Sequence, residues 1–480
     1  MNGLFVVTIP ASIAPEQLAI KDERHAWTYA ALLERAQQYA RHLQQVVAVG
    51  DTVAILLTNS TQYMAAILGC WASGVIAMPI NNRSSQQELD VFLQDAQYVI
   101  TEQRYRDFSF AVPAFVVGQD QFLSGQYEER EYEVAFYLYT SGSSGTPKKV
   151  RIFHEVLSGY ILNHQDTIDG TDKGVYLNTV PLFHITGLTA VLNALFAGRT
   201  VIMQEGFHAQ TWLQTIQQEH VTHTFVVPTM LYDLLQHPQL ETCCTSLTHM
   251  TYGGAPMPVT LIRQAIERLP HIAFSNAFGL TETTATIAVL APEDHQLHIG
   301  NRAQKERRLA SVGRVVEDVI IRIRRGDTIC LPNEEGIIEV ATSRLNHYAH
   351  TLPTEWFVTH DVGYVDEDGY LFITGRSSDV IVRGGENIMP QSIEAVLLQH
   401  EAIEQVIVFG VEDARWGQRV AAAIICNDDV CDEALQAYVK GYMASFQVPQ
   451  QWIRLTEMPL NATGKIDRRR LQQLACQTEE

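Results

Sequence analysis

The chain has 480 residues, of which 46% are hydrophobic and 18% are charged, and its formal net charge is −20. This length exceeds one ordinary hydrophobic core, so we expect a globular protein with at least two domains. The acidic balance argues against nucleic-acid binding, which needs a basic face.

The N-terminal region shows no sign of export or membrane insertion. Its first apolar run lacks a preceding basic segment and is interrupted by Pro10, unlike a signal peptide. The most apolar stretch, Met64–Ile80, is shorter than the roughly 20 residues of a membrane span. We expect a buried helix ending near Ser73, a cap at Gly74 and then a strand. Scattered cysteines fit reduced thiols, so we expect a cytoplasmic protein.

Short β-branched runs alternate with helical stretches over the first 300 residues or so. The run VAILL precedes a helix from about Thr61, and AFYLYT reads as a strand. Farther on, THTFVVP precedes a helix from about Thr229, and HIAFSNAFG follows a helix around Leu261–Leu269. This alternation is typical of α/β layers with mostly parallel sheets.

From about Ala310 the pattern changes to hairpin-linked antiparallel strands, with turns expected at Arg325–Asp327 and Asn333–Gly336. A compact α+β unit follows, and we place the domain boundary between residues 376 and 377. The expected domains are therefore 1–376 and 377–480. The elements expected in the second domain are a helix over Pro390–His400, strands at QVIVFGV and VAAAIIC, a helix over Glu433–Met443 and a basic tail.

The stretch YTSGSSGTPKKV, Tyr139–Val150, combines small hydroxyls, two glycines and two lysines directly after a predicted strand. Such a loop can present N–H groups, hydroxyls and positive charge to phosphate oxygens. It matches neither the P-loop spacing nor the dinucleotide-binding glycine pattern. By composition alone, a plain surface loop is an equal alternative. The candidate phosphate contacts are Thr140, Ser141, Gly142, Ser143, Ser144, Gly145 and Lys148.

Further stretches, read in order with this loop, resemble the acyl-adenylate-forming superfamily of acyl-CoA synthetases, adenylation domains and luciferases. They are PLFHITGL, YGGAPM, AFGLTETTA, SVGR, HDVGYVDEDGYLFITGR, VRGGENIMPQSIEAVL and NATGKIDR. The resemblance implies an α/β N-terminal domain of mostly parallel sheets with a β-rich subdomain, and a small mobile α+β C-terminal domain. It also implies an enzyme that activates a carboxylic acid with ATP and Mg²⁺ and transfers it to coenzyme A.

Thr281 and Glu282 follow a strand, and ligands bind at this edge of open α/β sheets. The resemblance places Thr281 on the α-phosphate and Glu282 on Mg²⁺, as a hard cation prefers. A helix cap is the structural alternative. The resemblance also implies that Asn276 and Phe278 contact adenine. The remaining nucleotide contacts it suggests are Gly254, Ala255 and Gly279.

Asp361 alone would suggest an Asx-turn and Arg376 an exposed hairpin arginine. The resemblance instead assigns both to the ribose of ATP. The family usually has glycine before this aspartate, and His360 stands there in this chain. Lys149 likewise stands where the phosphate loop usually has glycine.

Lys465 matches the lysine that, in the family, bridges the attacking carboxylate and the α-phosphate. If a helix starts near Thr463, this lysine and the arginines of NATGKIDRRRL crowd its positive end, which the helix dipole disfavours. Such an inconsistency often marks function. For the arginines, a solvated basic tail is an equal alternative.

The remaining predicted residues concern the acyl and thiol sites. His184 lies among apolar residues, where a satisfied core histidine is the usual interpretation. The resemblance gives it a positioning role between the nucleotide and acyl pockets. Gly384 and Gly385, expected in a strand-to-helix turn, correspond to the face that meets the pantetheine arm. The hinge position holds Ser378, and Gln447 stands where a basic residue is common, so a carrier-protein thiol stays open as the acceptor.

The sequence thus predicts an AMP-forming carboxylate–CoA ligase. Its length and Ser378 resemble the o-succinylbenzoate–CoA ligases, while fatty-acyl and aryl–CoA ligases stay open. A luciferase-like oxygenase would share nearly every motif. A non-enzymatic nucleotide-binding protein would have lost catalytic residues, yet these are present. The expected partners are the acid, ATP and CoA, with a homodimer left open.

Overall fold

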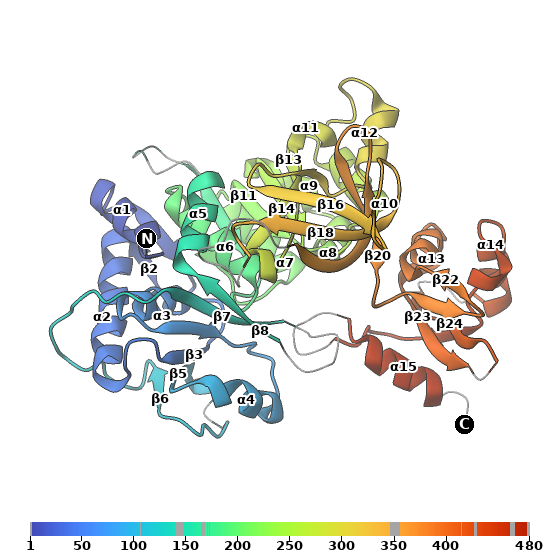
Figure 1. The fold of residues 1–480 in the computed structure, drawn as a ribbon. Helices are drawn as coiled ribbons and strands as arrows, with labels where there is room; N and C mark the ends of the chain where they lie inside the picture. Colours follow the sequence, from blue (N-terminus) through green and yellow to red (C-terminus); the bar gives the residue numbers. More distant parts are fainter. Residues whose placement is uncertain are drawn as a thin grey trace. The chain divides into compact units, whose positions relative to one another are not determined.

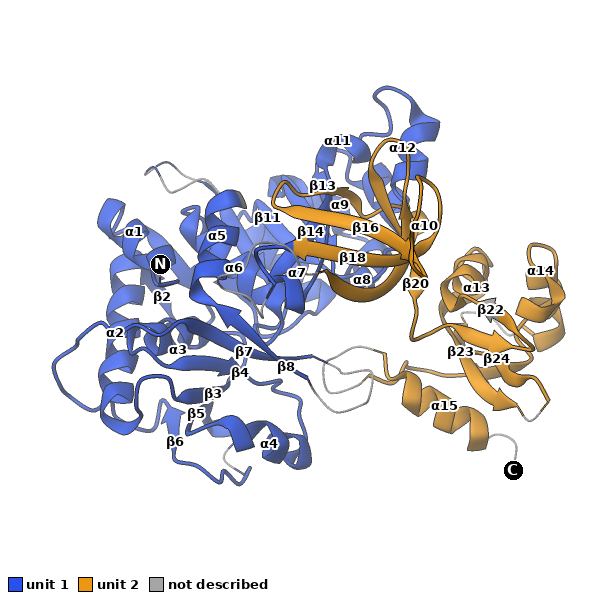
Figure 2. Cartoon of the chain, in the orientation of Figure 1, with its two compact units in different colours: residues 1–257, 261–309, 342–354 blue, residues 258–260, 310–341, 355–480 orange. Residues whose placement is uncertain are grey.

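The computed structural model describes residues 2–477. It leaves out residues 106, 141–147, 165–168, 170, 172, 346–355, 414, 427–429 and 461–465, and the side chains of His164 and Asn387. The chain divides into two compact units (Figure 2). Unit 1 comprises Met1–Met257, Leu261–Leu309 and Thr342–Thr354, and unit 2 comprises Pro258–Thr260, Ala310–Ala341 and Glu355–Glu480. The predicted boundary at residues 376–377 lies within unit 2 and stays a prediction.

The first sheet of unit 1 has the strand order β6-β5-β3-β4-β7-β8 (Figure 1). All neighbours are parallel except β7 and β8, which form an antiparallel pair. The predicted strand AFYLYT is part of β7. The strands are β3 (Thr52–Leu56), β4 (Ile76–Pro79), β5 (Tyr98–Glu102), β6 (Ala114–Val117), β7 (Val134–Thr140) and β8 (Lys148–Phe153).

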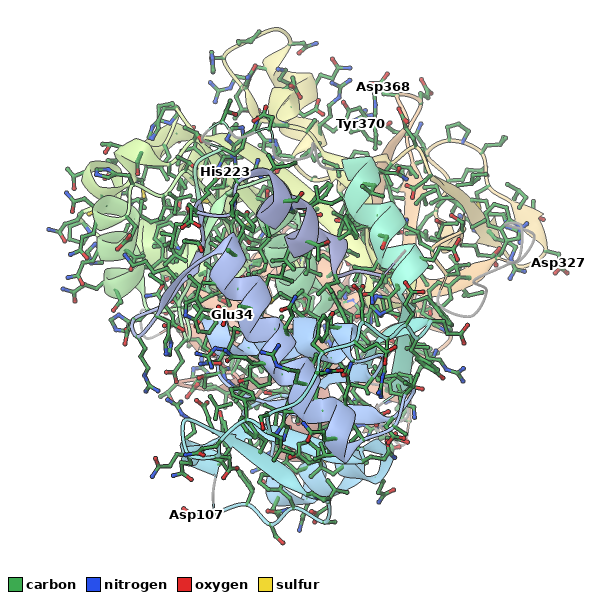
Figure 3. The ribbon with its side chains drawn as sticks, turned by 90° about the vertical axis from the view of Figure 1, so that its left-hand side faces the viewer. Glu34, Asp107, His223, Asp327, Asp368 and Tyr370 are labelled. Carbon is green, nitrogen blue, oxygen red and sulfur yellow. The ribbon has the colours of Figure 1, made fainter. Side chains whose placement is uncertain are left out.

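The second set of strands in unit 1 has the order β14-β13-β12-β11-β9-β10-β1-β2. Its six central strands are parallel, and β2 and β14 pair antiparallel with their neighbours. The strands are β1 (Leu18–Lys21), β2 (Ala26–Thr28), β9 (Val175–Asn178), β10 (Thr200–Met203), β11 (His223–Val226, with His223 labelled in Figure 3), β12 (His249–Gly253), β13 (Ala273–Leu280) and β14 (Ala285–Leu290).

Helices cover these sheets, and α3 shows why they form. The hydroxyl of Ser60 accepts the N–H of Tyr63 at 3.3 Å and caps the helix. Nearly all residues of α3 are buried. Gly74, just beyond the end of α3, has φ +72°, as the predicted cap requires. The helices are α1 (Phe5–Ile13), α2 (Tyr29–Val46), α3 (Thr61–Ala72), α4 (Gln86–Phe92), α5 (His154–His164), α6 (Ile185–Phe196), α7 (Ala209–Gln218), α8 (Pro228–Gln236), α9 (Leu240–Cys243), α10 (Val259–Arg268), α11 (Pro292–His295) and α12 (Arg302–Arg308).

Unit 2 begins with an antiparallel set of strands in the order β17-β16-β18-β19-β20-β15. The turn predicted at Arg325–Asp327 joins β16 to β17, and β18 pairs with the other side of β16 rather than with β17. Asp368 lies in the turn before β20, which begins at Tyr370 (Figure 3). The strands are β15 (Gly313–Val315), β16 (Val319–Arg325), β17 (Thr328–Ile329), β18 (Gly336–Thr342), β19 (Phe357–Val365) and β20 (Tyr370–Arg376).

The rest of unit 2 is a small α+β fold around a sheet of order β22-β21-β24-β23, with β25 pairing with β24. The helices and the two long strands predicted here are confirmed, and with them the α/β class of the whole chain. The elements are β21 (Ile381–Arg383), β22 (Glu386–Ile388), α13 (Pro390–Leu397), β23 (Ile403–Asp413), β24 (Gly417–Cys426), α14 (Asp432–Lys440), β25 (Gln451–Arg454) and α15 (Arg468–Gln477).

Candidate active site

The predicted phosphate loop lies between β7 and β8. Its two ends are paired, with Tyr139 opposite Lys149 and Thr140 opposite Lys148. The Thr140 hydroxyl donates to the Lys148 carbonyl at 3.5 Å. The predicted contacts Ser141, Gly142, Ser143, Ser144 and Gly145 lie outside the described residues. The strands therefore bring Thr140 and Lys148 together at the mouth of a hairpin.

Lys149, which replaces a glycine of the family pattern, lies within β8 and does not have a positive φ. Its Nζ lies 2.9 Å from Asp95 Oδ1 and 4.7 Å from the ring centroid of Tyr137. The Tyr139 hydroxyl donates to Asp95 Oδ2 at 2.6 Å. Burial would raise the pKa of Asp95, but the Tyr139 hydroxyl and the Lys149 ammonium outweigh it and lower that pKa. Asp95 thus joins the base of the hairpin to the preceding part of the sheet.

The carboxyl ends of the parallel strands carry most of the other predicted residues of unit 1. Since β9, β11, β12 and β13 run parallel, their ends meet at one edge of the sheet, where open α/β folds bind ligands. The predicted residues that lie near or after these ends are His184, Gly254, Ala255, Phe278 and Gly279. Asn276 lies in the middle of β13, opposite Tyr252 of β12. His184 immediately precedes α6, and its ring lies 4.4 Å from that of Phe183.

Thr281 and Glu282 form a tight turn between β13 and β14. They belong to a single 3₁₀ turn, Thr281–Thr283, which leads through Thr284 into β14. Its capping residue is Leu280 and not Thr281, while Glu282 lies in the first turn, as the helix-cap alternative expected. The sharpness of the turn depends on Gly279, where a Cβ atom would lie 1.8 Å from the carbonyl oxygen of Ala285. The Thr283 hydroxyl donates to the Leu280 carbonyl at 3.1 Å. This packing presents Glu282 at the end of the sheet.

Asp361 and Arg376 face each other on β19 and β20 of unit 2. Arg376 Nε donates to Asp361 Oδ1 at 2.7 Å. The Asx-turn interpretation is wrong, because Asp361 lies inside a strand. His360 has φ +63°, the left-handed conformation that explains why the family has glycine here. The histidine keeps the backbone shape that the sequence had put in doubt.

Gly384 and Gly385 join β21 to β22 with φ values of +60° and +90°. The predicted strand-to-helix turn is therefore a two-residue β-hairpin, since two positive φ values define its favoured turn. The helix α13 begins only at Pro390, which occupies the predicted first position. A Cβ at Gly384 would lie 2.9 Å from the Trp416 ring, whereas one at Gly385 would meet nothing within 4 Å. Gly385 thus leaves an open approach to the hairpin.

Lys465 lies outside the described residues, but the segment after it is well defined. The helix predicted from Thr463 begins instead at Arg468, where the Asp467 carboxylate accepts the N–H of Arg470 at 3.0 Å. Arg468 is no solvated tail residue. Its guanidinium lies 3.3 Å from Asp379 and 3.6 Å from Glu394, and these carboxylates offset the cost of its positive charge at the helix start. Burial raises the pKa of Glu394, while Arg468 opposes that shift.

Sequence reasoning missed the acids that hold these cations. Asp95 and Asp379 lie far along the chain from Lys149 and Arg468, and neither belongs to a motif. The signal that could have pointed to an acidic partner such as Asp95 was Lys149, because it stands where the family pattern has glycine. For Arg468, the signal was the basic cluster at a predicted helix start.

Comparison with known proteins defines the class. The AMP-binding enzyme family matches residues 10–345, and the AMP-binding enzyme C-terminal domain matches residues 392–465. The chain belongs to this family. A 2-succinylbenzoate–CoA ligase of Bacillus pumilus (strain SAFR-032) is 30% identical over 96% of each chain. The o-succinylbenzoate CoA synthetase of Bacillus subtilis, solved with its acyl-adenylate intermediate, has a TM-score of 0.84 at 29% identity over 98% of each chain.

The predicted activity, an AMP-forming carboxylate–CoA ligase, is confirmed at the level of class by these relatives. The predicted use of ATP, Mg²⁺ and CoA agrees with them, since the Bacillus subtilis synthetase was also solved in complex with ATP and a magnesium ion (TM-score 0.83, 29% identity, 98% of this chain and 99% of that one). Across the described ranges, we find no helix both long and apolar enough to cross a membrane. The roles of individual site residues stay predictions.

Proposed function

We propose that this enzyme activates 2-succinylbenzoate, or an aromatic keto acid of the same kind, and transfers it to CoA. The observation that supports this substrate is similarity along the whole chain to ligases that carry that name. Pyrophosphate release should be measured with a panel of succinylbenzoate, benzoate and fatty acids. A clear preference for a fatty acid or a simple benzoate would contradict the proposal.

In the first half-reaction, a carboxylate oxygen attacks the α-phosphorus of ATP, and the bond to pyrophosphate breaks. The chain's task is to position both groups and stabilise developing charge. We assign phosphate binding to the loop from Thr140 to Lys148 and charge stabilisation to Lys465. The hairpin geometry supports the first assignment, since paired strands hold both ends of the loop.

Glu282 is the residue that would hold Mg²⁺, which would neutralise phosphate charge. Mg²⁺ usually takes one or two carboxylates together with waters and substrate phosphates. Glu282, in the Thr281–Thr283 turn after β13, offers one such carboxylate. Glu282 would therefore share the ion with ATP, with Thr281 beside it on the α-phosphate.

The nucleoside part of ATP has its own set of proposed contacts. We assign the ribose hydroxyls to the carboxylate of Asp361, with Arg376 as its partner. Adenine would lie against Phe278, with its amino edge toward Asn276. Gly254, Ala255 and Gly279 would contribute backbone surface, which suits their positions at the ends of β12 and β13.

In the second half-reaction the CoA thiol attacks the acyl carbon, and AMP leaves. We propose that residues 377–480 turn about Ser378, so that the Gly384–Gly385 hairpin replaces Lys465 at the site. The open space at Gly385 supports this use. His184 would position the acyl group at the junction of the two pockets.

The thiol acceptor, the cellular location and the assembly of the enzyme are also proposals. CoA is the acceptor that the relatives' names support, and a carrier-protein thiol is the alternative, because Gln447 replaces a common basic residue. We infer action in the cytoplasm, where ATP and CoA are available, and a homodimer as the assembly. Comparing turnover with CoA and with a phosphopantetheinyl carrier tests the acceptor. Cell fractionation tests the location, and light scattering tests the homodimer.

A further inference from the structure

The backbone directly after Glu282 is strained. Thr284 has φ +49° and ψ +68°, and Ala285 has φ +76°. Residues with side chains rarely adopt such values, and two in succession persist only where the surroundings over-determine them. Both residues are buried. The strain thus lies two and three residues beyond the predicted Mg²⁺ ligand.

Arg344 is the residue that holds this strained segment. Its side chain is buried, and Nη1 donates to the Thr286 carbonyl at 2.9 Å and to the Thr284 carbonyl at 3.4 Å. In return, the Thr284 hydroxyl donates to the Arg344 carbonyl at 3.3 Å. The guanidinium therefore spans the strained residue and the strand that follows it.

Tyr160 completes the support from a separate helix, α5. The guanidinium carbon of Arg344 lies 5.4 Å from the Tyr160 ring centroid, within the range of a cation–π contact. The Tyr160 hydroxyl is 3.2 Å from the Thr286 hydroxyl. Arg344 and Tyr160 thus hold the start of β14 through its carbonyl groups and through a side chain.

Burying an arginine is costly, because the group stays charged at any ordinary pH. An apolar side chain of similar volume could fill the same space without that cost. The distinctive contribution of Arg344 is a charged donor, Nη1, that reaches the carbonyls of both Thr284 and Thr286. Thr284 ends the short connection that carries Thr281 and Glu282, and Thr286 lies at the start of β14.

We propose that Arg344 is a positioning residue for Glu282. By holding the Thr284 and Thr286 carbonyls, it keeps the Thr281–Thr283 turn in the shape that presents the Glu282 carboxylate to a metal–ATP complex. The inference rests on the proposed function, since it concerns the ion that Glu282 would share with ATP. It adds a residue outside every motif that the sequence revealed.

The decisive variants are Arg344→Met, which keeps the length, and Arg344→Lys, which keeps the charge. Mn²⁺ serves as the probe, and its binding in the presence of ATP is followed by electron paramagnetic resonance without the acid substrate. We expect Arg344→Met to weaken Mn²⁺ binding and to slow adenylation by about tenfold to a hundredfold, the loss typical of a small displacement in a positioned site. Arg344→Lys should recover part of both.

Two further variants separate positioning from support of the fold. Arg302→Met removes an exposed arginine of the same unit, which pairs with Glu306, and should change neither measurement. Ala285→Gly relieves strain at φ +76° and, combined with Arg344→Met, should restore part of the Mn²⁺ affinity. If Arg344→Met does not fold, Mn²⁺ binding and adenylation are measured on the folded Arg344→Lys protein instead, and these decide between positioning and support of the fold.

The outcomes distinguish this inference from the proposed function. If wild type binds Mn²⁺–ATP and the folded Arg344 variants bind it equally well, Arg344 supports only the fold and the inference is overturned. A melting temperature that falls while Mn²⁺ affinity stays constant overturns it as well. If wild type binds no Mn²⁺–ATP, the proposed function fails together with the inference.

Discussion

Arg376 and Asp361 form an ion pair across two neighbouring strands, with Nε donating to Oδ1 at 2.7 Å. The Asp361 side chain is 5% exposed and that of Arg376 is 48% exposed. The pair therefore holds a buried carboxylate within β19, between β18 and β20, with its cation toward solvent. This arrangement suits a carboxylate that must accept hydrogen bonds from a ligand in one orientation.

The first prediction is that Asp361→Asn raises the KM for ATP by about tenfold to a hundredfold, the loss expected when hydrogen bonds to a charged group are weakened. The KM is measured by pyrophosphate release at saturating acid. Arg376→Gln should have a smaller effect, because the carboxylate remains. Arg314→Gln, on β15 of the same sheet, is the matched control and should leave KM unchanged. If Asp361→Asn left the KM for ATP unchanged, the assignment of Asp361 to the ATP site would be wrong.

The second prediction concerns Glu282. Glu282→Gln should sharply reduce adenylation and raise the Mg²⁺ concentration that it requires, since a neutral amide is a poor ligand for a hard cation. Circular dichroism should show an intact fold, because Glu282 lies in a short turn. Glu306→Gln, at an exposed ion pair, is the control. Wild-type Mg²⁺ dependence in a folded Glu282→Gln protein would leave Glu282 with a role in the turn alone.

The third prediction separates the two lysines of the hairpin. Lys149 lies in a strand, so Lys149→Gly should keep adenylation activity even though it removes the ion pair with Asp95. A partly exposed pair of this kind is worth about 0–1 kcal/mol of stability. Lys148→Ala should lower ATP use more strongly, because Lys148 is the predicted phosphate contact. Pyrophosphate exchange ranks the two variants, and the reverse order would show that the loop motif is aligned one residue out of place.

Local pattern was enough to predict elements whose shape depends on nearby residues. Examples are the helix predicted to end near Ser73 before Gly74, the strand before the phosphate loop and the α+β fold of the C-terminal region. Those predictions succeeded because hydrophobic period, caps and glycine positions act over a few residues. The helix start at Arg468 was missed although its cap, Asp467, was available in the sequence.

Contacts between distant parts of the chain were out of reach of pattern alone. Asp95 binds Lys149, and Arg344 binds carbonyls near residue 285, through packing that no local period encodes. The sequence also did not show that β18 would pair with β16, on the side away from β17. Long-range partners of single charges depend on the completed fold.

The fourth prediction uses the backbone of His360. With φ +63°, His360→Gly should stabilise the protein, because removing the left-handed strain outweighs the extra chain entropy of glycine by about 0.5–1 kcal/mol. Thermal unfolding measures the gain. Asn333, with φ +65°, offers a matched control: asparagine tolerates this conformation, so Asn333→Gly should gain less. Equal gains at the two sites would show that strain at His360 is not the cause.

The fifth prediction separates the half-reactions. Lys465→Ala should slow acyl-adenylate formation by about a hundredfold to a thousandfold, the range found when one preorganised charge-stabilising group is removed. The same variant should convert a supplied acyl-adenylate with CoA at nearly the wild-type rate. Gly385→Asn should show the opposite pattern, because a side chain there fills the open approach to the hairpin. Asparagine is chosen because it tolerates the φ of +90° better than other residues.

The experiment gives each variant either the acid with ATP or the synthetic adenylate with CoA, and measures the two rates separately. Gly384→Asn is the comparison for hairpin damage, since its Cβ would collide with Trp416 rather than enter open space. If Gly384→Asn and Gly385→Asn lose both steps equally, the hairpin matters for folding and not for the thiol. If Lys465→Ala also loses both steps, one arrangement of the C-terminal region serves both reactions, and the turn about Ser378 is wrong. Opposite losses in Lys465→Ala and Gly385→Asn require two faces of that region to act in succession, because with one arrangement for both reactions neither substitution would affect a single step only.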